Sequence, residues 1–103
     1  QAMKHPTVDI LMGAEMTRSY LYHAATVWRD ETDEAVIEEA VRMAKCCASE
    51  HFSEAGDRGI QFHGGFGFTY ECDAQLFLRR ALWSQYQFGD DRHQRQKLGA
   101  LLF

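Results

Sequence analysis

The chain has 103 residues, which is long enough for one domain with its own core but rarely enough for two. Hydrophobic residues make up 46% and charged residues 25% of the sequence, a balance that excludes a disordered chain. The net charge of -4 argues against nucleic acid as a partner, and no apolar run approaches the ~20 residues that a helix needs to cross a membrane.

Two long helices are predicted in the first part of the chain. Apolar residues recur every three or four positions over residues 7–29, and Pro6 suits the first turn of that helix. A polar run follows, in which Thr32 or Asp33 is a suitable N-cap for the next helix. The apolar period then resumes and continues to about His63. The pattern therefore indicates two long helices joined by a short polar loop.

Glycines and acidic residues divide the rest of the chain into two shorter helices. The Gly-Gly-Phe-Gly run at residues 64–67 is predicted to stop the second helix. A third helix is predicted to start near Asp73, and Asp90 or Asp91 to cap a fourth that runs to Leu102. The whole chain is therefore predicted to form a single all-α domain, an antiparallel up-and-down bundle of about four helices.

The most informative segment for function is Gln-Phe-His-Gly-Gly-Phe-Gly-Phe at residues 61–68. Glycines let a backbone come close to a ligand, and successive free amides form a concave site that suits an anion. The segment is not a dinucleotide-binding fingerprint, because that loop follows a strand and opens a helix, whereas this one closes a helix. On the residues alone, ligand contact and a plain helix C-cap both stay open.

Other candidate sites have weaker support. Cys47 and His51 are four residues apart, the spacing of two metal ligands on one helix face, but the sequence places no third or fourth donor, so no metal site is predicted. Glu38 and Glu39 are neighbours that point to different sides of a helix, so they are no catalytic pair. The odd number of cysteines, two of them adjacent, argues against a disulfide scaffold and favours a reducing compartment.

The glycine segment also resembles part of a known family. Residues 61–69, with the sequence QFHGGFGFT, and residues 76–81, with the sequence LFLRRA, look like the C-terminal helical domain of acyl-CoA dehydrogenases. The resemblance covers essentially the whole chain. Members of this family have an N-terminal helical domain, a middle β domain and this C-terminal bundle. The resemblance therefore implies that residues 1–103 are a fragment of a longer three-domain chain, which we expect in the bacterial cytoplasm.

The resemblance implies a flavin enzyme that removes the α proton and a β hydride from an acyl-CoA thioester. In the family, the Gln-x-x-Gly-Gly segment contacts the FAD of the neighbouring subunit, which at this chain's positions names Gln61, Gly64 and Gly65. The implied partners are the acyl-CoA substrate, a neighbouring subunit of a homo- or hetero-oligomer, and an electron acceptor. The isolated 103 residues are expected to be inactive, because they hold too little of the flavin and thioester pocket.

The catalytic base is where the sequence departs from the family. Many members end the corresponding helix in Tyr-Glu-Gly-Thr, whose Glu is the base, and here the Glu position falls on Phe88, with Gly89 and Asp90 in place of Gly-Thr. A phenyl ring cannot take a proton, so no catalytic residue is assigned. Asp90 is a weak substitute because it is displaced and one methylene shorter than Glu.

The same departure keeps a rival hypothesis open. The Phe88-Gly89-Asp90 ending resembles actinobacterial branches, some of which act on bulky or steroid side-chain thioesters. Several of these are heteromers in which one kind of subunit lacks the base. The alternatives are therefore a base-less partner subunit, or a helical interaction and assembly module without chemistry of its own. The acidic net charge and the aromatic residues of the C-terminal half are compatible with both.

Overall fold

The computed structural model describes residues 1–103 and contains helices but no β-strand. This confirms the predicted all-α class. Four long helices account for most of the chain, and a fifth segment is a single helical turn. The elements are α1 (Lys4–Asp30), α2 (Glu34–Phe62), α3 (Gly64–Gly67), α4 (Ala74–Tyr86) and α5 (Asp91–Leu102).

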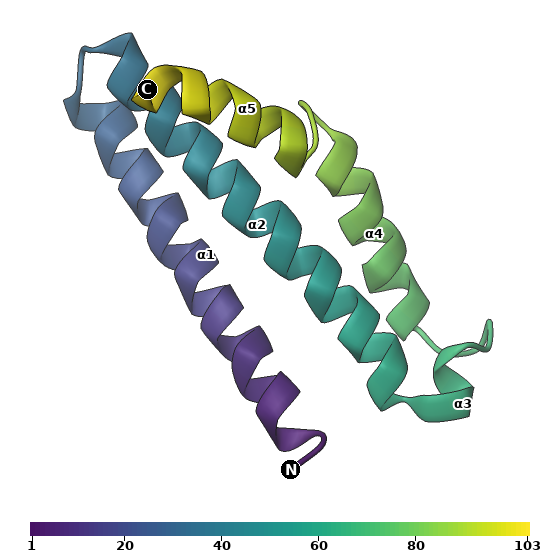
Figure 1. Ribbon diagram of the computed structural model, residues 1–103. Helices are drawn as coiled ribbons and strands as arrows, with labels where there is room; N and C mark the ends of the chain where they lie inside the picture. Colours follow the sequence, from purple (N-terminus) through teal and green to yellow (C-terminus); the bar gives the residue numbers. More distant parts are fainter.

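Helix α2 is the centre of the fold, and all the other helices pack on it (Figure 1). Helix α1 lies along one side of α2 and runs in the opposite direction. Helices α4 and α5 follow one another along another side, and together they run back along α2 (Figure 1). The molecule is consequently elongated, with extents of 50 × 25 × 24 Å.

Local sequence explains where the helices begin. The Asp33 carboxylate accepts a hydrogen bond of 2.9 Å from the Ala35 N–H at the start of α2. The Asp90 carboxylate accepts one of 2.9 Å from the His93 N–H at the start of α5. Both contacts satisfy backbone donors that have no partner within the helix. Asp33 and Asp90 are therefore the N-caps. Each is one of the two candidates predicted from the sequence for its helix.

The glycine run ends α2 as predicted but also forms a structure that was not predicted. Helix α2 stops at Phe62, and Gly64 takes the left-handed backbone conformation, with φ of 58°. The chain then makes the single turn of α3, which folds back against the end of α2. A Cβ added to Gly67 would overlap the Ile60 carbonyl oxygen, so only glycine permits this close return.

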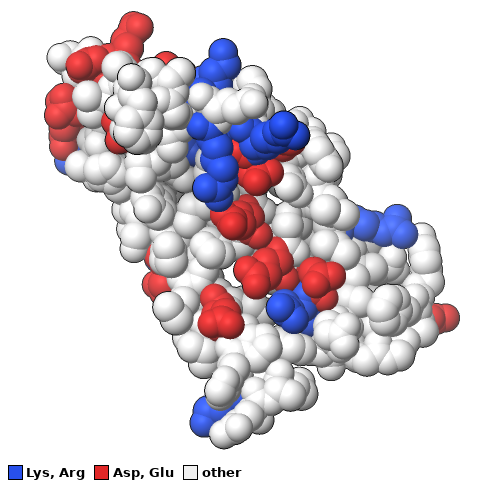
Figure 2. All heavy atoms as spheres, in the orientation of Figure 1, with Lys and Arg blue, Asp and Glu red and all other residues white.

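The helices meet through small side chains. A Cβ added to Gly13 would lie 2.6 Å from Nδ1 of His51, and one added to Gly56 would lie 2.9 Å from Cα of Leu78. No large side chain is fully buried. Large apolar residues lie instead on the outside. They include Leu11, Met12, Tyr22, Trp28, Phe68, Tyr70, Trp83 and Tyr86. Figure 2 shows that uncharged surface separates the charged groups on the face in view.

None of the helices is both long enough and apolar enough to pass through a lipid bilayer.

Candidate functional site at the end of helix α2

The predicted ligand-binding residues lie together at the C-terminal end of α2. Gln61 is in the last turn of α2, and Gly64 and Gly65 open α3. All three are exposed, and the side-chain amide of Gln61 makes no hydrogen bond within the chain. Cβ atoms added to Gly64 or Gly65 would have no neighbouring atom within 4 Å. The backbone of this segment is therefore open to a ligand from outside the chain.

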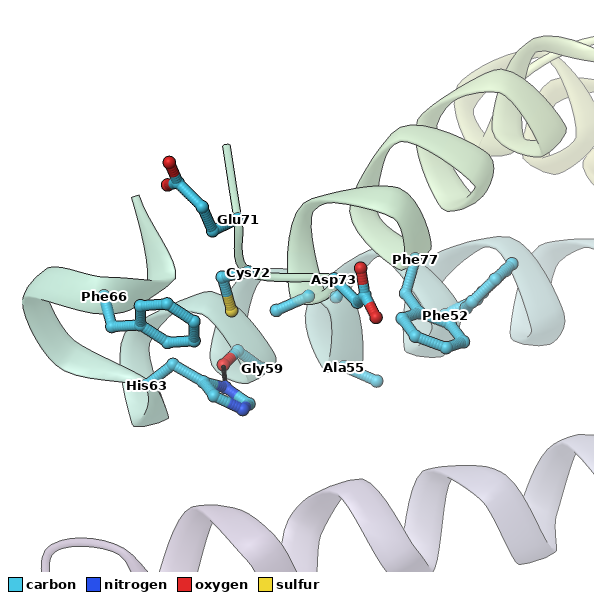
Figure 3. Close-up of a pocket in the computed structure, with 11 residues that line it drawn as sticks. Phe52, Ala55, Gly59, His63, Phe66, Glu71, Cys72, Asp73 and Phe77 are labelled. Atoms are coloured by element: carbon cyan, nitrogen blue, oxygen red, sulfur yellow. Dashed lines mark hydrogen bonds between the residues drawn. The ribbon is translucent and has the colours of Figure 1, made fainter. Parts of the chain in front are cut away.

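A groove that the sequence did not predict lies on the other side of α2, with a cavity volume of about 610 Å³ (Figure 3). Phe52 and Gly59 line it from α2, His63 from the position just after α2, and Phe77 from α4. Gln61 is two residues from both Gly59 and His63, so it points away from the groove. The spacing of Phe52, Gly59 and His63 places them on one helix face, so this wall of the groove could have been predicted from the sequence. The wall from α4 could not, because it depends on tertiary packing.

A hydrogen bond selects the tautomer of the His63 ring at this groove. Its Nδ1 lies 2.7 Å from the Gly59 carbonyl oxygen (Figure 3). A carbonyl oxygen only accepts, so Nδ1 carries the hydrogen, and in the neutral ring Nε2 is the acceptor. Cys72, which is buried, lines the same groove, as do Glu71 and Asp73. The structure contains no group of three or more His, Cys, Asp or Glu residues arranged to hold a metal ion.

Cys47 and His51 take part in packing between α1 and α2. Cys47 is buried, and its Sγ lies 3.6 Å from Oγ1 of Thr17. The His51 ring of α2 lies against Gly13 of α1, so closely that a Cβ at position 13 would overlap it. The ring therefore fills space between the helices, and Cys47 and His51 both belong to the packing of α1 on α2.

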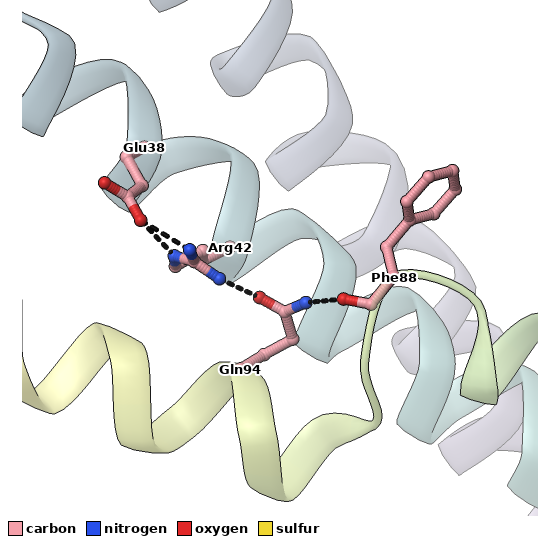
Figure 4. A network of polar contacts seen from close by, with 4 residues as sticks. All are labelled: Glu38, Arg42, Phe88 and Gln94. Atoms are coloured by element: carbon pink, nitrogen blue, oxygen red, sulfur yellow. Dashed lines mark hydrogen bonds and ion pairs between the residues drawn. The ribbon is translucent and has the colours of Figure 1, made fainter.

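The other candidate position, Phe88, lies at the far end of α4 from Gln61. Phe88 has φ of 62°, and the residue is 91% exposed. Its carbonyl oxygen accepts a hydrogen bond from Nε2 of Gln94, which is buried (Figure 4). Oε1 of Gln94 in turn accepts a hydrogen bond of 2.6 Å from Arg42, and Arg42 pairs with Glu38. A chain of polar contacts from α2 through α5 thus fixes this turn.

Lys45 holds the end of α4 immediately before this turn. Its Nζ donates to the carbonyl oxygens of Ser84, at 2.8 Å, and Gln85, at 3.4 Å, and to Oγ of Ser49, at 2.7 Å. A cation at this position compensates the negative end of the helix dipole. Burial lowers the pKa of Lys45, because it disfavours the charged ammonium. Burial likewise raises the pKa of the neighbouring Cys46 thiol.

Comparison with known proteins gives the family. The family model described as "Acyl-CoA dehydrogenase, C-terminal domain" matches residues 1–103. Acyl-CoA dehydrogenase IpdE2 of Mycolicibacterium smegmatis is 31% identical over 103 residues, which cover 100% of this chain and 30% of that protein. IpdE2 of Mycobacterium tuberculosis is 33% identical over 84 residues, 79% of this chain and 23% of that protein.

A further relative carries a different name. The probable acyl-CoA dehydrogenase FadE25 of Mycobacterium tuberculosis is 32% identical over 96 residues, 92% of this chain and 24% of that protein. The chain thus spans less than a third of the length of these relatives. No solved structure matches the chain. Because the family model covers the chain from end to end, this protein belongs to the acyl-CoA dehydrogenase family and carries its C-terminal domain.

Proposed function

We propose that this domain helps to hold FAD in a full-length acyl-CoA dehydrogenase, through Gln61, Gly64 and Gly65. The observation that supports this most directly is the empty space around Gly65. A Cβ at this position would contact nothing within the chain, so the chain's own packing does not require glycine there. A ligand that approaches the backbone closely would require it.

The residues present fit the cofactor. The exposed amide of Gln61 offers both donors and an acceptor, and the bare backbone at Gly64 and Gly65 leaves room for a diphosphate. When bound, the flavin would accept a hydride from the β carbon of an acyl-CoA thioester. The exposed apolar side chains of the bundle suit burial against other domains and a neighbouring subunit of an oligomer.

The flavin contact is tested by Gly65→Ala and Gln61→Ala in the full-length protein. We expect each variant to fold normally and to retain FAD about tenfold less tightly, which corresponds to ~1.4 kcal/mol. FAD retention is measured by equilibrium dialysis and absorbance. Gly99→Ala is the matched control, because a Cβ there also meets no atom within 4 Å, but the residue lies in α5. Unchanged retention in both test variants would instead favour a domain that serves assembly and does not contact the flavin.

We further propose that this chain contributes no catalytic base. Phe88 occupies the position of the family's glutamate and has no group that takes up a proton. Asp90 is engaged as the N-cap of α5. The base then comes from another part of the longer chain or from a partner subunit.

Cys46, Cys47 and Cys72 are all free thiols, which suits the reducing cytoplasm of a bacterium.

Two substitutions in the full-length protein distinguish an Asp90 that only caps α5 from an Asp90 that acts as the base. Asparagine caps a helix as well as aspartate does, so Asp90→Asn is expected to leave both the melting temperature and flavin reduction by an acyl-CoA unchanged. Asp90→Ala is expected to lower the stability by about 1 kcal/mol through loss of the cap. If Asp90→Asn melted normally but no longer reduced the flavin, Asp90 would be the base and the proposal would be wrong.

A further inference from the structure

We draw no further inference here: the strongest candidate, the apolar groove between the C-terminal end of α2 and α4 that Phe52, Phe66 and Phe77 line, is an unpartnered face, and nothing in the structure shows what covers it.

Discussion

Replacing Phe88 with glutamate is expected to raise the rate of flavin reduction by an acyl-CoA about 10²–10⁴-fold in full-length protein composed of this subunit alone, the usual contribution of a positioned general base. The backbone at this position is already fixed by Gln94 and already tolerates a Cβ at φ 62°. A carboxylate on the same backbone would point outward, as the phenyl ring now does. The rate is measured at saturating thioester by stopped-flow loss of the visible flavin band.

Phe88→Gln is the matched control for this substitution. Glutamine has nearly the size and shape of glutamate but cannot accept the α proton, so its rate should stay at the wild-type level. Equal rates for the two variants would show that position 88 does not face the α carbon. A wild-type protein that already reduces its flavin rapidly would show that a base elsewhere in the same chain suffices.

Gly56→Ala is expected to destabilise the fold by about 1–3 kcal/mol, the usual cost of overpacking. The added Cβ would lie 2.9 Å from the Cα of Leu78. The obstacle is backbone of α4, which cannot rotate away as a side chain can, so the two helices would have to move apart. The free energy of unfolding is measured by urea denaturation, followed through helical circular dichroism.

Gly59→Ala in the same helix gives the opposite expectation. Gly59 lies one turn further along α2, and a Cβ there would meet no atom within 4 Å. Alanine favours the helix over glycine by about 1 kcal/mol, so this variant should be more stable than the wild type. If Gly56→Ala were also more stable than the wild type, helix propensity rather than close packing of α2 and α4 would determine the stability at position 56.

The helices and their caps could be predicted because they depend on near neighbours in the sequence. Asp33 caps α2 through a residue two positions away, and Asp90 caps α5 through one three positions away. Gln61, Gly64 and Gly65 lie together for the same reason. The need for glycine at positions 13 and 56 could not be predicted, because His51 and Leu78 are distant in sequence and meet them only in the folded chain.

The groove and the Phe88 turn were missed for the same physical reason. The wall of the groove at Phe77 depends on how α4 lies against α2. The conformation of Phe88 depends on a hydrogen-bond chain in which Arg42 and Gln94 are 52 residues apart. A local reading of the sequence would assign the left-handed conformation to Gly89 alone, whereas residues 88 and 89 both adopt it.

The central position of α2 has a consequence for how the domain unfolds. Helix α1 packs on α2, and α4 and α5 pack on α2, but the two sides share little contact with one another. Either side can therefore detach while the other keeps its packing, so the domain contains two partly independent cooperative units that share one helix. The predicted flavin-binding residues lie at the end of that shared helix. They therefore keep their conformation only if α2 stays helical when α1, or α4 with α5, detaches from it.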